Sequence, residues 1–279
     1  MIASFNAEVL KSRKRSGNWI LFFVLLTLLL AFGYVITYLV LTHPPKRFES
    51  PIPPSILKRE TFPENLLADV LSSMTTLGAA IMIILGALSS ASEYGWLTVQ
   101  TILVQKPGRT AVLAGKLLNL AVTVFLICVA VLGAAALTSF ILVSIDGSTS
   151  NFPSATELLK GLGALYLQLA TWTAFGMFLG ILFRSTAGAI GGGLTYLFVG
   201  EAVLVRLLSD TAGVKEVLKF FPGQNAEAIN ATFPLTFHNP QAATPLVSAS
   251  RGVITLLVFL AVFTILSLVL FQRRDVTGG

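Results

Sequence analysis

The sequence predicts an all-α integral membrane protein with six transmembrane helices. This prediction rests on the composition and on six long apolar stretches. Hydrophobic residues make up 54% of the 279 residues and charged residues only 11%, whereas roughly a quarter of a soluble domain is charged. The mean hydropathy is +0.82. Each stretch is long enough to cross a hydrocarbon core of about 30 Å, which takes roughly 20 helical residues. The stretches are 19–41, 70–91, 117–145, 161–183, 187–205 and 252–271.

Residues 1–16 predict an amphipathic helix at the membrane surface, because Ile2, Phe5 and Val9 share one helical face and a basic cluster lies elsewhere. A mobile basic tail is the alternative. The apolar run that follows is too long for the core of a signal peptide, and no cleavage site of small residues ends it, so we expect a retained first span.

The orientation follows from the basic cluster at 11–15, which directly precedes the first span, the span whose flank usually dominates topology. We therefore expect a multi-pass protein of the cell inner (plasma) membrane with both termini in the cytoplasm.

The parts outside the spans indicate a single domain over 1–279, with no repeat and no low-complexity tract. The first outer loop, 42–65, contains six prolines and is expected to be extended for most of its length. The outer segment 209–250 is long for a plain loop. Its stretch 220–229 predicts short helices that dip back into the outer leaflet.

A polar segment, 92–109, separates the second and third spans and predicts a short cytoplasmic helix. Ser90 precedes Glu93 by three residues, the spacing of a capping box, which would start a helix as the chain leaves the membrane. A Pro-Gly turn closes it. The segment also carries apolar and aromatic side chains of the kind that anchor interfaces: Tyr94, Trp96 and Leu97. The alternative is that its aromatics form part of the interfacial belt.

The layout resembles the permease subunit of type-2 ABC exporters. The resemblance rests on the motif Glu93-Tyr94-x-Trp96 after the second span, the turn that ends at Arg109, Lys116 at the opening of the third span, and Phe221-Pro222-Gly223 before the last span. It implies that 1–279 is a permease domain. It also implies that 92–109 is a coupling helix that sits in a groove of a nucleotide-binding subunit. The partner would then contact Glu93, Tyr94, Trp96, Leu97 and Arg109.

The energy source is expected on another chain. The sequence contains no GxxxxGK[ST] phosphate loop, so we expect no cofactor here and ATP and Mg²⁺ on a cytoplasmic ABC ATPase subunit. Membrane lipid and a second copy or a related permease complete the expected partners. Nucleic acid is not expected, because the basic residues lie at the ends of apolar runs. Nor do we expect catalytic residues or a metal site: Cys128 is alone, and His43 and His238 have no ligand-spaced companions.

A substrate path is predicted from polar residues inside the spans. Glu201 is the only acid well inside the predicted spans, where a charge costs a few kcal/mol unless it is paired, hydrated or protonated. Gln168 and Thr171 are further candidates. The alternatives are that Glu201 and Arg206 reach the outer interface, and that the polar residues bond neighbouring helices. We expect ATP-driven export by alternating access; the second hypothesis is an ATP-independent channel or secondary transporter.

The topology can be tested by cysteine labelling in a Cys128→Ser background. Single cysteines at Ser148 and Thr236 are expected to react with a membrane-impermeant maleimide added to intact cells, because both lie on the predicted outer face. Cysteines at Ser12 and Thr277 should react only after the cells are opened. Labelling of position 12 in intact cells would reverse the orientation.

Overall fold

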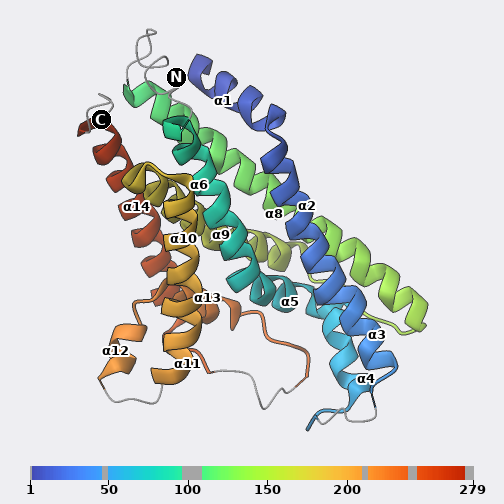
Figure 1. The fold of residues 1–279 in the computed structure, drawn as a ribbon. Helices are drawn as coiled ribbons and strands as arrows, with labels where there is room; N and C mark the ends of the chain where they lie inside the picture. The colour runs from blue at the N-terminus through green and yellow to red at the C-terminus, as the bar shows by residue number, and fades with distance from the viewer. Residues whose placement is uncertain (1, 46–49, 96–108, 209–212, 238–243, 274–279) are drawn as a thin grey trace.

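The computed structural model describes residues 2–45, 50–95, 109–208, 213–237 and 244–273, and this part of the chain is built from helices (Figure 1). Five helices of the described part are long and apolar enough to cross a membrane. The prediction of an all-α protein with several membrane-spanning helices is confirmed. These helices are Ser16–Thr42, Pro63–Ala91, Thr110–Asp146, Ala155–Phe183 and Ala249–Arg273.

The first two spans each contain a π-helical turn. The first consists of α2 (Ser16–Leu28), the π segment η1 (Leu29–Ile36) and α3 (Thr37–Thr42). The second consists of the 3₁₀ turn η3 (Pro63–Asn65), α5 (Leu66–Ser73), the π segment η4 (Met74–Gly78) and α6 (Ala79–Gly95). The other three are single helices: α8 (Arg109–Asp146), α9 (Ala155–Phe183) and α14 (Ala249–Arg273).

The predicted segment 187–205 forms a helical run that is not among these five. It consists of α10 (Thr186–Thr195), the π segment η5 (Tyr196–Val203) and α11 (Leu204–Leu208). The chain reverses after α9 through Arg184, whose φ is 52°. Ser185 then caps α10, its side chain accepting a hydrogen bond from the Gly188 amide. In Figure 1 the run extends along the bundle from the end of α9 to α12.

The two ends of the bundle differ. One end holds α1 (Ile2–Lys14) and the last turns of α14, and we call it the terminal end (Figure 1). The other, the loop end, holds three short helices: α4 (Pro54–Leu57), α12 (Val214–Leu218) and α13 (Pro222–Asn230). The helix expected within 1–16 is thus present, as is one within 220–229. Helix α13 is mostly buried and packs against α14, α9 and α5.

The prediction of an extended loop over 42–65 is wrong for the second half of this range. There α4 is followed by the 3₁₀ turns η2 (Lys58–Thr61) and η3. Pro54 and Pro63 open α4 and η3 at the first helical position. At the first helical position a backbone N–H has no partner within the helix, so proline, which lacks this group, loses no hydrogen bond there. Proline therefore favours a helix start at this position.

The centre of the bundle is a close contact between α6 and α9. A Cβ added to Gly176 would lie 2.2 Å from the Ile83 carbonyl oxygen, and one added to Gly86 would lie 2.1 Å from that of Thr173. Such contacts are typical of membrane helices, where small residues let two backbones approach. The spacing Gly176-x-x-x-Gly180 therefore serves packing within the chain.

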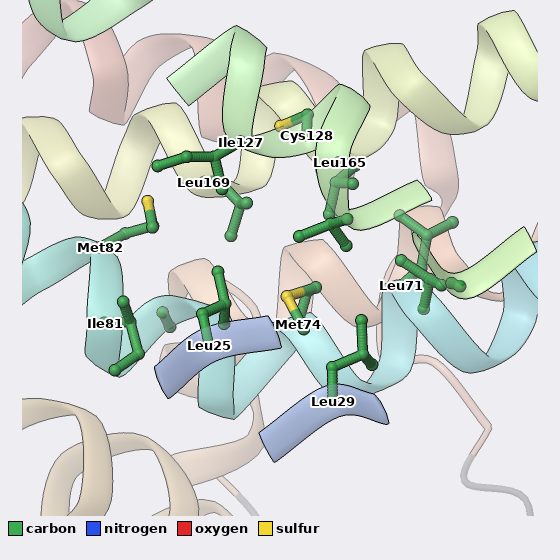
Figure 2. Close-up of a cluster of buried hydrophobic side chains, with 14 of the residues drawn as sticks. Leu25, Leu29, Leu71, Met74, Ile81, Met82, Ile127, Cys128, Leu165 and Leu169 are labelled. Carbon is green, nitrogen blue, oxygen red and sulfur yellow. The ribbon is translucent and has the colours of Figure 1, made fainter. Parts of the chain in front are cut away.

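A cluster of buried apolar side chains surrounds this contact (Figure 2). Cys128 is fully buried in it, as expected of a packing residue. Because the cluster joins four of the spanning helices, it holds them as one body. Its labelled members come from the first span (Leu25, Leu29), the second (Leu71, Met74, Ile81, Met82), α8 (Ile127, Cys128) and α9 (Leu165, Leu169).

The contact between α6 and α9 can be tested with two glycines of the same helix. Gly176→Ala is expected to destabilise the folded protein by about 1–3 kcal/mol, because a backbone carbonyl stands where the methyl group would go. Gly163→Ala is the control, since nothing lies within 4 Å of its Cβ position. The measurement is the thermal unfolding midpoint of each variant in detergent. Equal midpoints would contradict the packing role of Gly176.

Candidate functional site

A cluster of polar side chains lies at the terminal end and joins α1, α6 and α8. Lys116, in the second turn of α8, has only 2% of its side chain exposed. Its Nζ donates to the Ser89 carbonyl of α6 at 2.7 Å and lies 3.4 Å from the Glu8 carboxylate of α1. A buried ammonium without such partners would cost several kcal/mol. Lys116 of α8 therefore connects this helix to both α1 and α6.

Two further hydrogen bonds attach α1 to the same helices. The Arg15 guanidinium, just after α1, donates to the Leu88 carbonyl of α6 at 2.9 Å. The Asn119 amide of α8 donates to the Ser12 hydroxyl at 2.7 Å. Since α6 ends at Gly95 and α8 begins at Arg109, α1 is bonded to both helices that flank the predicted coupling segment.

The predicted contact residues of that segment lie at or beyond the ends of these helices. Glu93 and Tyr94 belong to the last turn of α6, and Arg109 is the first residue of α8. Trp96 and Leu97 lie outside the described residues, as do the side chains of the other three.

The predicted capping box at Ser90 is wrong. Helix α6 continues without a break from Ala79 to Gly95, so Ser90 is an interior residue. Its hydroxyl donates to the Met177 carbonyl of α9 at 3.1 Å. The local spacing suggested a helix start, but the close approach of α9 gives the hydroxyl a partner on another helix.

A second polar cluster surrounds α13. Glu201, on η5, is 7% exposed, and its Oε2 accepts a hydrogen bond from the Gly223 amide at 2.6 Å. Gly223 is in the first turn of α13, where amides lack helical partners and the helix dipole favours an anion. A Cβ at Gly223 would lie 1.9 Å from this oxygen, so glycine is required there. The carboxylate is therefore buried against α13.

The second carboxylate oxygen of Glu201, Oε1, is also buried, and the Tyr196 side chain lies beside the carboxylate. The Trp172 indole N–H of α9 is buried and makes no hydrogen bond within the described residues. Trp172 packs 6.3 Å from the ring of Tyr196, which in turn lies 6.3 Å from the ring of Phe221. Since π segments such as η5 are frequent at functional sites, this region is a candidate site by geometry as well as by charge.

Gln168 and Thr171 are fully buried where helices meet. The Gln168 amide donates to the Asn230 side-chain oxygen of α13 at 2.8 Å, and the Asn230 amide donates to the Thr75 hydroxyl at 2.9 Å. The Thr171 hydroxyl lies 3.4 Å from the Leu256 carbonyl of α14. Both residues therefore bond neighbouring helices.

One acid within a spanning helix, Asp69, was not predicted from the sequence. Asp69 lies in α5, because the second span begins at Pro63 and not at 70. Its Oδ2 is buried and lies beside the Tyr34 hydroxyl, which is also buried. The apolar run 66–68 before Asp69 was the available signal. Among the described residues, His, Cys, Asp and Glu form no group of three that could hold a metal.

Taken together, these features define an all-helical protein with several membrane-spanning helices and polar clusters at the terminal end and around α13. Residues 61–277 match the model of a family described as "Protein of unknown function (DUF2705)", so the chain belongs to this family. No curated protein matches the chain.

The bond between Glu201 and α13 leads to a stability prediction. Glu201→Ala is expected to lower stability by about 1–3 kcal/mol, because the Gly223 amide would be buried without an acceptor. Glu201→Gln should lose less stability, since the side-chain carbonyl oxygen of glutamine can still accept the hydrogen bond from the Gly223 amide. Glu216→Gln, on the exposed face of α12, is the control. Thermal unfolding midpoints for the three proteins decide the matter, and an unchanged midpoint for Glu201→Ala would disprove this role.

Proposed function

We propose that the chain is the transmembrane permease subunit of an ATP-driven ABC exporter in the cell inner (plasma) membrane. The observation that carries this proposal is the attachment of α1 to both α6 and α8 through Lys116, Arg15 and Asn119. These contacts support a function in which a surface helix and the two flanks of segment 96–108 move together. A partner that pushes on this segment would thereby move three helices at once.

The proposed membrane arrangement has six crossings, the fifth made by α10, η5 and α11. The start of α1 and the end of α14 lie at the same end of the bundle (Figure 1), and a chain whose ends share one side crosses an even number of times. Five spans and this run make six. The basic cluster at 11–15 favours the cytoplasm for the terminal end.

In the proposed mechanism, a cytoplasmic ABC ATPase binds ATP and Mg²⁺ and holds the coupling segment through Glu93, Tyr94, Trp96, Leu97 and Arg109. ATP-driven closure of the ATPases would displace α6 and α8. A second copy of the chain, or a related permease, completes the pathway between inward and outward access.

The proposed substrate path passes α13. This helix is bonded to η5 through Glu201 at its start and to α9 through Gln168 at its end. Thr171 faces α14 from the same side of α9. Because each of these is a polar bond inside the membrane, water or a polar substrate group can replace it when the helices separate.

An ATP-independent channel or secondary transporter is the second candidate, and Asp69 and Glu201 favour it. Acids within spans are typical of proton and ion pathways. Transport that continues without any bound ATPase would support this candidate.

The export hypothesis is tested by purifying the chain with its partners. Trp96→Ala and Glu93→Ala are expected to weaken ATPase binding by about 2 kcal/mol, roughly a thirtyfold loss of affinity, because interface energy is concentrated in a few aromatic and charged anchors. The ratio of ATPase to permease in the purified complex is the measurement.

Trp19→Ala provides the matched control, since Trp19 is 49% exposed on α2, close to α1. It should leave the ratio unchanged. Normal recovery of the ATPase with both Trp96→Ala and Glu93→Ala, together with normal transport, would contradict the coupling role of the segment.

A further inference from the structure

A pocket of about 510 Å³ opens at the loop end of the bundle. Its walls come from the first turns of α5 and α9 and from the segment 232–236 after α13. The apolar part of the wall includes Leu67, Ala68, Phe152 and Phe233. This volume suits a small polar group together with the first part of an apolar chain.

Two carboxylates line the pocket, and each has one oxygen already engaged. Glu157 forms a capping box with Ser154: its Oε2 accepts from the Ser154 amide and hydroxyl, both at 2.7 Å. Glu64 accepts from the Arg59 guanidinium at 2.7 and 2.8 Å, in both cases through Oε1. The carboxylates are therefore held in place, and these bonds leave the second oxygen of each to a ligand.

An ammonium group completes the charged part of the wall. Lys160 is exposed on α9, three residues after Glu157 and hence on the same face of the helix. A purely anionic ligand would be repelled by Glu64 and Glu157, and a purely cationic ligand by Lys160. A ligand that carries an ammonium and an anionic group close together matches both.

Exposed apolar side chains lie in and next to the segments that form the pocket. Leu159 is 70% exposed beside Lys160, and Phe152 is 46% exposed. The Phe152 ring lies 6.3 Å from that of Phe140, itself exposed on α8. Exposed apolar side chains at the end of spanning helices face the boundary between acyl chains and headgroups.

We propose that this pocket binds the phosphoethanolamine headgroup of a membrane phospholipid. The lipid ammonium donates to Glu157 and Glu64, the phosphate accepts from Lys160, and the acyl chains lie over Phe152 and Leu159. A primary ammonium has three N–H donors for carboxylates, whereas a choline group has none, so ethanolamine lipids are preferred. The inference needs the spanning helices but not the exporter function.

The test measures lipids retained by the purified protein. The full chain is reconstituted into bilayers with equal parts of phosphatidylethanolamine and phosphatidylcholine and a fixed part of phosphatidylglycerol, then released into mild detergent. Native mass spectrometry counts the lipids that stay bound. We expect ethanolamine lipid to exceed choline lipid by roughly fivefold or more, as charge-assisted hydrogen bonds imply.

Two variants separate the two charges of the headgroup. Glu157→Gln keeps the helix cap, because glutamine also serves at the third position of a capping box, but removes one of the two carboxylates that bind the ammonium. It should lower the preference for ethanolamine lipid below that of the unchanged protein. Lys160→Gln should reduce retention of both lipids, and Lys160→Arg should restore it. Lys215→Gln, exposed on α12 at the same end, is the control.

Thermal unfolding of each variant shows whether it is folded, and if Glu157→Gln is not, the Lys160 variants alone decide. Equal retention of the two lipids by the unchanged protein would overturn the proposal. So would an unchanged preference in folded Glu157→Gln, or no loss of retention in folded Lys160→Gln. A small non-lipid amine that copurifies and displaces the lipid would also overturn it, in favour of a substrate site.

Discussion

The structure depends on the backbone contact between α6 and α9. Within lipid, helices gain little from burying apolar surface, because the acyl chains are as apolar as leucine, so close packing must supply the attraction. Gly86 and Gly176 bring the two backbones together, and Gly193 of α10 lies against Ile83 in the same way, its Cβ position 2.5 Å from that side chain. Helix α9 then carries α13 and α14 on its other side. Replacing one of these glycines would therefore disturb both the apolar cluster and the polar contacts of α13.

A second constraint arises from α13, a short helix buried among spanning helices. Backbone groups in such a place must find partners inside the protein, because the hydrocarbon offers none. Glu201 serves the Gly223 amide at the start of α13, while Asn230, at its end, donates to the Leu71 carbonyl at 3.1 Å. An acid on η5 and an amide on α13 thus hold the fold together. The same groups are candidates for transport because polar bonds can exchange with water, whereas apolar packing cannot.

The sequence could predict what depends on length and local composition. The apolar runs placed five spanning helices, and the stretch 220–229 indicated a helix. Contacts between distant residues could not be predicted. Lys116 was predicted only as the residue that opens the third span, yet it is buried, because Glu8 and Ser89 approach it from two other helices. The hydrogen bond of Ser90 to α9 could not be predicted either, because it too joins residues far apart in the sequence. Asp69 was missed because the proline that opens its helix was interpreted as part of a loop.

The contact between Glu8 and Lys116 has a consequence for biosynthesis, since 108 residues separate them along the chain. A ribosome adds roughly 5–20 residues per second, so α1 emerges about 5–20 s before the helix on which it docks. In that interval Glu8 can pair with Lys11 on the same helix, but not with Lys116. Nascent α1 therefore reaches its final contacts only after the start of α8 has been synthesised, and a chain that stalls before residue 116 leaves this helix without its binding site.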